Sequence, residues 1–303
     1  MRLHSPVFLA ILLFVSVATE STALQSLSTN TNDVPRLLRS HPITTTEGEE
    51  RVGGLNTIAN AVKSTAAKFK QTKELKGYLK QQQSADEVFA LLKLTDKTDN
   101  ILTHPKIEAM AKYITMLNKE NPRNRVQLID VLAARLGDDV VSRMIEAAKS
   151  IPTSKKLADK LQTDQFRGWF ERETTPVALV GILKLDDAAN MGNANFKVLE
   201  KYLNVYNSHF NKKMNIVEVF RRGYGGQQNL AKALVALPET NTNAKELQRQ
   251  LFTKWATVDK YTRNEYLKNV MKRDDTNWFS HPLANVFIHY SNFLNKAKVP
   301  NVQ

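Results

Sequence analysis

The sequence predicts an all-α protein in which tandem helical bundles stack into an elongated, solenoid-like rod behind a disordered leader. Three observations lead to this prediction. From about residue 54 onward, apolar residues recur every three or four positions, as on one face of a helix. Only 11 Gly and 10 Pro occur in 303 residues, which disfavours turn-rich β folds. Aromatic residues then recur at intervals of 86–91 residues, which indicates several copies of one unit.

Residues 1–23 have the layout of a secretory signal peptide. One Arg precedes the apolar run of residues 7–17, and small residues precede a predicted cleavage after Ala23. The run is too short to span a bilayer comfortably, and no later stretch approaches 18 apolar residues. We therefore expect a secreted chain without a transmembrane segment. A buried N-terminal helix or a short anchor is the alternative.

Residues 24–62 form a predicted disordered leader, because residues 24 to about 52 are rich in Ser, Thr and Asn and show no helical period. Two charged clusters stand in it, ten residues apart. They are Arg36, Leu37, Leu38 and Arg39, followed by Glu49, Glu50 and Arg51.

A pattern that contains Trp occurs twice in the body of the chain, 86 residues apart. The corresponding residues are Leu161, Phe166 and Trp169 in the first occurrence and Leu247, Phe252 and Trp255 in the second. A weaker occurrence has Tyr78 in the Trp position, 91 residues before Trp169. This position therefore requires a large aromatic side chain rather than indole chemistry.

A second pattern, centred on Tyr and followed by Asn, repeats with the same period. Its tyrosines are Tyr113, Tyr202 and Tyr290, which lie 89 and then 88 residues apart. Large aromatic side chains each bury on the order of 200 Å² and dominate the packing of a small unit. We therefore expect six structural core anchors, namely Tyr78, Tyr113, Trp169, Tyr202, Trp255 and Tyr290.

Further helices are expected to link the copies. The predicted linking pairs are 126–135 with 138–149, and 216–222 with 230–237, and Gly137 and Gly225 fall at corresponding turns. The sequences Thr103-His104-Pro105 and Ser280-His281-Pro282 predict helix starts with a hydroxyl N-cap and Pro just inside the helix.

A signal peptide, an RxLR string and an EER string in this order resemble the leader of the oomycete RXLR effectors. The repeated units are similar to the WY and LWY modules of the same family. The resemblance implies a first WY module with its linking helices over 63–150, an LWY module over 151–240 and a short terminal LWY module over 241–303. It also implies that Arg36–Arg39 and Glu49–Arg51 act in secretion or translocation.

The sequence offers little catalytic chemistry. The chain has no cysteine, which excludes disulfides, thiolate nucleophiles and Cys-based zinc sites. Its six histidines have no metal-ligand spacing, and no GxSxG elbow or phosphate loop occurs. We expect no enzyme activity, no cofactor and no metal.

The chain is basic, with 43 Lys and Arg against 30 Asp and Glu and a formal net charge of +13. Six lysines crowd the first long helix, but acids are interleaved with bases elsewhere and no nucleic-acid-binding fold accompanies them. We interpret the charge as a solvated helical surface and do not expect nucleic acid as a partner.

The resemblance implies an effector that is translocated into plant cells, acts in the cytoplasm or nucleus, and suppresses immunity by non-catalytic binding of a host protein. A phosphatase scaffold, an autophagy protein, a kinase or a trafficking component fits the family. The residues that bind the partner are not identified by the sequence. The alternative is an extracellular basic helical protein that binds anionic membrane or polymer surfaces.

Overall fold

The structure is a computed structural model that describes residues 69–94, 98–273 and 277–297. The chain divides into two compact units, Met1–Asn56 and Thr57–Gln303, and every described residue lies in the second. The signal peptide and the two charged clusters of the leader lie outside the described residues and stay predictions. Below, the three copies are the segments around Tyr78 and Tyr113, around Trp169 and Tyr202, and around Trp255 and Tyr290.

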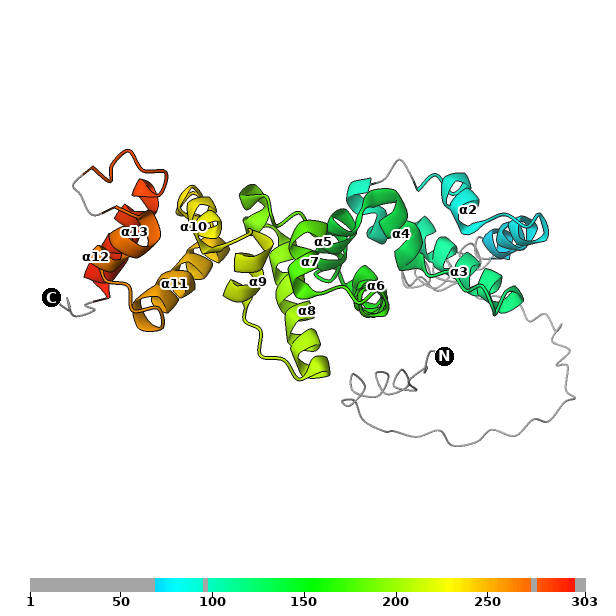
Figure 1. Cartoon of the computed structure of the whole chain (residues 1–303). Coiled ribbons are helices and arrows are strands. Elements are labelled where there is room, and N and C mark those ends of the chain that lie inside the picture. The colour runs from blue at the N-terminus through cyan, green and yellow to red at the C-terminus, as the bar shows by residue number, and fades with distance from the viewer. Residues whose placement is uncertain (1–68, 95–97, 274–276, 298–303) are drawn as a thin grey trace, which may run out of the picture. The chain divides into compact units, whose positions relative to one another are not determined.

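The predicted all-α fold is confirmed, because every regular element in the described residues is helical (Figure 1). Each copy begins with the helix that carries the Trp position. These helices are residues 69–80, α6 (Pro152–Glu171) and α11 (Thr242–Thr257). The stacking of the copies into a solenoid-like rod stays a prediction.

A short second helix follows in each copy. These helices are α2 (Ala85–Leu91), α7 (Pro176–Ile182) and α12 (Arg263–Glu265), and α12 continues into the π-helix η3 (Tyr266–Met271). Each begins after a hydroxyl N-cap, namely Ser84, Thr175 or Thr262. The hydroxyl oxygen accepts a hydrogen bond from the N–H three residues on, which satisfies an otherwise unpaired donor.

The Tyr-bearing helices come next. They are α3 (Pro105–Glu120), α8 (Ala194–Phe210) and α13 (Ala284–Lys296), and the 3₁₀ helices η1 (Thr98–Thr103) and η2 (Ala188–Gly192) precede the first two. The predicted cap of α3 is wrong by one residue. His104 is the N-cap, and its Nδ1 accepts from the Lys106 N–H at 3.2 Å. An unprotonated imidazole nitrogen offers the same lone pair as a hydroxyl oxygen, so it can replace one.

His104 has an equivalent in each later copy. Asn193 accepts from the Asn195 N–H at 2.8 Å, and His281 accepts from the Leu283 N–H at 3.1 Å. In the third copy α13 begins at Ala284, so Pro282 lies before the helix rather than inside it. The Ser280 hydroxyl is therefore not the N-cap.

Two linking pairs connect the copies. They are α4 (Leu128–Leu136) with α5 (Asp138–Ala148), and α9 (Ile216–Gly223) with α10 (Gln227–Val235). Gly137 and Gly226 cap the second helix of each pair with φ values of 86° and 139°, which other residues rarely adopt. Gly226, and not Gly225, is therefore the equivalent of Gly137.

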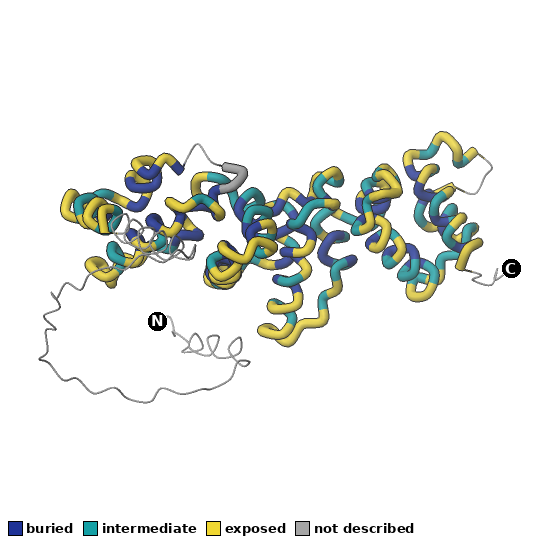
Figure 2. The backbone as a smooth tube through the Cα atoms, turned by 180° about the vertical axis from the view of Figure 1, so that it is seen from behind, coloured by how far each residue is buried: buried dark blue, intermediate teal, exposed yellow. Residues whose placement is uncertain are grey.

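Each linking pair packs on the copy that follows it. Helix α5 contacts α6 and α8, and α10 contacts α11 and α13 (Figure 1). We call these contacts the first and the second junction. In Figure 2 the buried and exposed stretches alternate along each helix, as expected where one face is packed.

The buried side chains form two hydrophobic clusters. One runs from Leu75 to Leu161, and the other runs from Trp169 to Leu294. The cores of the second and third copies are therefore continuous, whereas the cluster of the first copy is separate and includes Ala158 and Leu161 from α6 of the second copy. The division into three modules stays a prediction.

Candidate functional site

The predicted anchors lie where the helices of a copy meet. Trp169, Trp255, Tyr113, Tyr202 and Tyr290 are fully buried. In the second copy the Trp and Tyr rings pack edge to face, with centroids 5.4 Å apart and an angle of 88°. The third copy repeats this arrangement at 5.4 Å and 84°. Edge-to-face packing brings the positive rim of one ring against the negative face of the other, which favours this geometry.

Tyr78 differs from the tryptophans at the same position, because it is only partly buried. Its hydroxyl donates to a Glu74 carboxylate oxygen at 2.6 Å, and this hydrogen bond raises the pKa of Tyr78 to about 12. Helices α5 and α10 cover Trp169 and Trp255, but no described linking helix covers Tyr78.

The three anchor tyrosines also share one polar contact. Each hydroxyl donates to a backbone carbonyl just after the Trp-position helix of its own copy. Tyr202 donates to Thr174 at 2.7 Å, Tyr290 donates to Tyr261 at 2.6 Å, and Tyr113 donates to Gln83. Burial raises the pKa of Tyr202 and of Tyr290, so both hydroxyls remain protonated donors at neutral pH.

The indole N–H groups extend this frame across the junctions. Trp169 Nε1 donates to Asp138 Oδ1 at 3.0 Å, and Trp255 Nε1 donates to Gln227 Oε1 at 3.0 Å. Asp138 and Gln227 are the first residues of α5 and α10. Each tryptophan therefore joins the core of its own copy to the linking helix of the copy before it.

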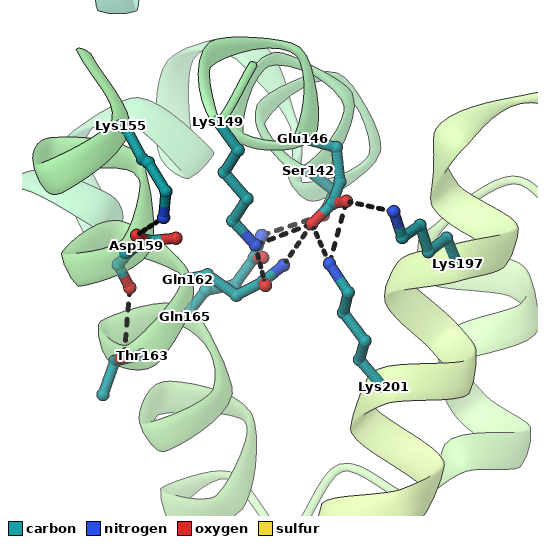
Figure 3. A network of polar contacts seen from close by, with 10 residues as sticks. All are labelled: Ser142, Glu146, Lys149, Lys155, Asp159, Gln162, Thr163, Gln165, Lys197 and Lys201. Carbon is teal, nitrogen blue, oxygen red and sulfur yellow. Dashed lines mark hydrogen bonds and ion pairs between the residues drawn. The ribbon is translucent and has the colours of Figure 1, made fainter. Parts of the chain in front are cut away.

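The first junction contains a polar network around a single carboxylate, Glu146 on α5 (Figure 3). Lys149 donates to Glu146 Oε1 at 2.7 Å, and Lys201 on α8 donates to the two oxygens at 2.7 and 2.9 Å. Gln162 on α6 donates to the same carboxylate at 3.1 Å, and Lys197 lies 4.0 Å away. Three helices thus converge on one acid.

The electrostatics of this network keep Glu146 ionised. Burial alone would raise the pKa of Glu146, but the hydrogen bonds from Lys149 and Lys201 outweigh it and hold the pKa below its usual value. Burial lowers the pKa of Lys149, and its contact with Glu146 only partly offsets this. The cost of removing these charges from water offsets much of their attraction. We therefore expect the network to add little net free energy of folding and to act mainly by fixing how α5, α6 and α8 lie against one another.

The second junction is apolar at the same places. Gly137 and Gly226 align α5 with α10, so Glu146 corresponds to Val235 and Ser142 corresponds to Ala231. Leu230, Ala231 and Leu234 of α10 are buried in the continuous cluster of the second and third copies. The first junction thus combines the polar network with apolar contacts between α5 and α6, because Ala158 and Leu161 of α6 belong to the cluster of the first copy, whereas the second junction lies within the cluster of the second and third copies.

The second copy also carries aromatic side chains at its surface, at the ends of α6 and α8. Phe170 lies 5.3 Å from His209 and 6.4 Å from Tyr206, and Phe210 lies 4.6 Å from Tyr206 and 4.5 Å from His209, between ring centroids. The exposed fraction of Phe210 is 44%, and that of neighbouring Val205 is 45%. We call Phe170, Val205, Tyr206, His209 and Phe210 the aromatic surface cluster.

The other copies lack this cluster. Tyr206 corresponds to Leu117 and Leu294, and Phe170 corresponds to Leu79 and Ala256. The anchors beneath it recur, but these surface residues do not. Sequence reasoning missed the cluster because periodicity assigns its residues to helices without saying which of them solvent reaches.

Sequence reasoning also missed the capping boxes. Ser84 with Glu87 and Thr262 with Glu265 follow the S/T-x-x-E pattern, and the Glu side chain accepts from the cap N–H in both. This sequence pattern marks the starts of α2 and α12.

Residues 69–94, 98–273 and 277–297 hold no group of three His, Asp or Glu side chains placed to bind a metal ion. No described helix is both long enough and apolar enough to cross a membrane.

Comparison with known proteins gives a consistent result. Residues 2–120 match the family model described as RXLR phytopathogen effector protein, avirulence activity. RxLR effector protein PSR2 of Phytophthora sojae is 27% identical over 248 residues, which cover 80% of this chain and 36% of that protein. PSR2 of Phytophthora infestans (strain T30-4) is 29% identical over 70% of this chain and 29% of its own length.

A further RxLR effector protein of Phytophthora infestans is 27% identical over 86% of this chain and 53% of its own length. The chain thus spans about a third to a half of the curated relatives it matches. Among solved structures, that of PcRxLR12 superposes with a TM-score of 0.56 at 24% identity, covering 78% of this chain and 58% of the other. That likeness concerns the fold alone.

Proposed function

We propose that the chain is an RXLR effector that enters host plant cells and suppresses immunity by binding a host protein without catalysing a reaction. The match of residues 2–120 to the family model and the similarity to RxLR effector proteins of Phytophthora support this proposal. In this proposal Arg36–Arg39 and Glu49–Arg51 direct secretion or translocation. The six anchors hold the fold, and exposed residues that differ between the copies bind the partner.

The aromatic surface cluster is the observation that supports this proposal best. Protein interfaces are enriched in aromatic residues, and truncating those near the centre of an interface costs the most binding energy. Contact of the aromatic rings with water is unfavourable, and a partner that covers them lowers the free energy of the complex. The fold does not require aromatic residues here, because the first and third copies have Leu or Ala at the positions of Tyr206 and Phe170.

The cytoplasm or the nucleus of the host cell is the proposed compartment. A chain without cysteine does not depend on disulfides, so a reducing cytosol would not weaken it.

The test is capture of host proteins by the chain lacking residues 1–23, expressed in plant cytosol, together with an immune readout such as the oxidative burst. We expect wild type to capture a specific protein and to reduce the burst. Phe210→Ser should weaken both effects at least about tenfold. Phe69→Ser is the matched control, because Phe69 is 74% exposed and makes no ring contact among the described residues.

Circular dichroism should show that both variants remain folded. Equal capture by wild type and Phe210→Ser would remove the cluster from the binding surface. An unchanged oxidative burst, with salt-sensitive retention on anionic lipid or polymer alone, would instead support an extracellular basic protein that binds such surfaces.

A further inference from the structure

A groove lies beside the first junction, where α3 approaches α6. The N-terminal end of α4 and the segment 125–127 complete its walls, and its volume is about 770 Å³. The side chains at its base are apolar, and they come from three helices. They are Ile114 on α3, Leu128 on α4, and Leu157 and Leu161 on α6.

The walls of the groove are held in place by the Asn that follows the Tyr pattern. Asn118 Nδ2 donates to the Val126 carbonyl at 2.7 Å, and Asn118 Oδ1 accepts from the Val126 N–H at 2.8 Å. These two bonds fix the segment between α3 and α4. A preformed groove does not need to be ordered on binding, which favours affinity.

The rim of the groove is basic. Lys119 and Arg125 lie on one side, Lys160 and Arg167 lie on α6, and Asp164 is the single acid among the lining residues. Asp164 already pairs with Lys160 at 2.8 Å and with Arg167 at 3.4 Å. Lys119 and Arg125 are exposed and form no ion pair with any described residue. The rim therefore carries an uncompensated positive charge.

The corresponding place at the second junction has different chemistry. Asn207 binds Met214 as Asn118 binds Val126, so Arg125 corresponds to Lys213 and Lys119 corresponds to Ser208. On α11, Lys160 corresponds to Glu246, which pairs with Arg249 at 2.6 Å. A basic rim around an apolar base is thus a property of the first junction and not of the repeat.

We propose that this groove binds an acidic amphipathic segment of the partner protein. Apolar side chains of the segment would enter between α3 and α6, and its carboxylates would meet Lys119 and Arg125. This matches the general mode in which an amphipathic helix lays its apolar face in a groove and charges at the edges fix its direction. The inference rests on the proposed function, which it deepens by naming the chemistry of the partner.

The apolar base of the groove favours a protein segment over nucleic acid as the ligand. Proteins that bind single strands stack bases on aromatic side chains, and none of the lining residues is aromatic. A phosphate backbone alone would use the basic rim but would leave the apolar base in contact with water.

The test uses three fluorescent 18-residue peptides and the chain lacking residues 1–23. The first peptide has Leu at three- and four-residue spacing with Glu at the flanking positions. The second has Lys in place of Glu, and the third has Ser in place of Leu. Fluorescence anisotropy should show binding of the first peptide at least about tenfold tighter than of the other two.

Variants of the chain then locate the binding. Lys119→Glu combined with Arg125→Glu should weaken the binding of the first peptide at least about tenfold. Lys212→Glu combined with Lys213→Glu is the matched control, because it changes the net charge equally on an exposed loop of the second copy. Thr115→Trp should also weaken binding, because exposed Thr115 lines the groove and a larger side chain would fill it without changing charge.

Several results would overturn the inference. Equal binding of the Leu and Ser peptides would mean that charge alone acts, and equal loss in both charge-reversal pairs would mean that the site is elsewhere. A 20-nucleotide poly(U) strand that binds as tightly, with the same losses, would assign the groove to nucleic acid. If Lys119→Glu with Arg125→Glu captures the host protein normally while Phe210→Ser does not, this inference fails and the proposed function stands.

Discussion

Replacing Tyr202 by Ala should destabilise the second and third copies by about 4–6 kcal/mol. The fully buried ring packs against Phe166, Trp169 and Phe170 at centroid distances of 5.4, 5.4 and 5.1 Å. Truncating a buried aromatic ring costs about 3–5 kcal/mol through lost burial and the remaining cavity. The lost hydrogen bond to Thr174 adds about 1 kcal/mol.

Tyr202→Phe separates these two contributions. It keeps the ring and removes only the hydroxyl, so we expect a loss of about 0.5–1 kcal/mol, since Thr174 is partly exposed and water can reach its carbonyl. Urea denaturation, monitored by tryptophan fluorescence, reports the unfolding of the second and third copies. All three Trp residues of the chain lie beyond residue 168, in the second and third copies.

Two results for Tyr202 would contradict its role as a core anchor. A loss below about 1.5 kcal/mol for Tyr202→Ala would mean that the ring is not a core anchor. Equal losses for the Ala and Phe variants would mean that the hydroxyl, and not the packing, holds α8 in place. Phe69→Ala, at a position that is 74% exposed, should leave the fluorescence transition unchanged.

Three other perturbations test the close approach of two helices, the loop closure and the polar junction. Gly223→Ala should cost about 1–3 kcal/mol in urea denaturation, because its Cβ would lie 2.8 Å from Val180. An added Cβ at Gly77, which lies in a helix, would meet open space, so Gly77→Ala should raise the free energy of unfolding by about 0.5–1 kcal/mol. Similar changes in stability for the two variants would contradict the close packing of Gly223 on Val180. Asn207→Ala removes two hydrogen bonds and should cost about 1–2 kcal/mol, and an unchanged urea midpoint would be the opposing result. Glu146→Gln should lower the free energy of unfolding by about 1–3 kcal/mol at pH 7. Because the pKa of Glu146 is lowered in the folded protein, the difference from wild type should shrink as the pH falls below 4.5. A difference that does not depend on pH would contradict the network.

The helical frame could be predicted because it depends on local, repeated patterns. Apolar spacing identifies helices, and the recurrence of Trp169 as Trp255 and of Tyr113 as Tyr202 identifies the copies. The misplaced cap at Thr103 shows the limit of this reasoning. A hydroxyl and the imidazole of His104 are both competent acceptors, and only the backbone path decides which is used.

The candidate site could not be predicted for a different reason. Glu146 and Lys201 are 55 positions apart, and nothing in either segment indicates that they meet. The exposure of Phe210 depends on where the loop after α8 turns away, since Asn211 adopts a left-handed conformation with φ of 48°. Tertiary packing therefore determines which side chains meet and which are exposed, whereas sequence periodicity determines only where the helices lie along the chain.

The contrast between the two junctions has a consequence for chain order. Lys201, which meets Glu146 at the first junction, is replaced by His289 in the third copy, and Lys197 is replaced by Asn285. Splicing the first linking pair directly onto the third copy would bury Glu146 without Lys197 and Lys201 and would leave it Lys149 as a lysine partner. A recombinant chain of that kind would lose stability, whereas the apolar faces of α10 and the third copy would tolerate exchange among relatives with similar cores. The first junction thus requires the second copy as its neighbour, whereas the second junction would accept the third copy of a relative with a similar core.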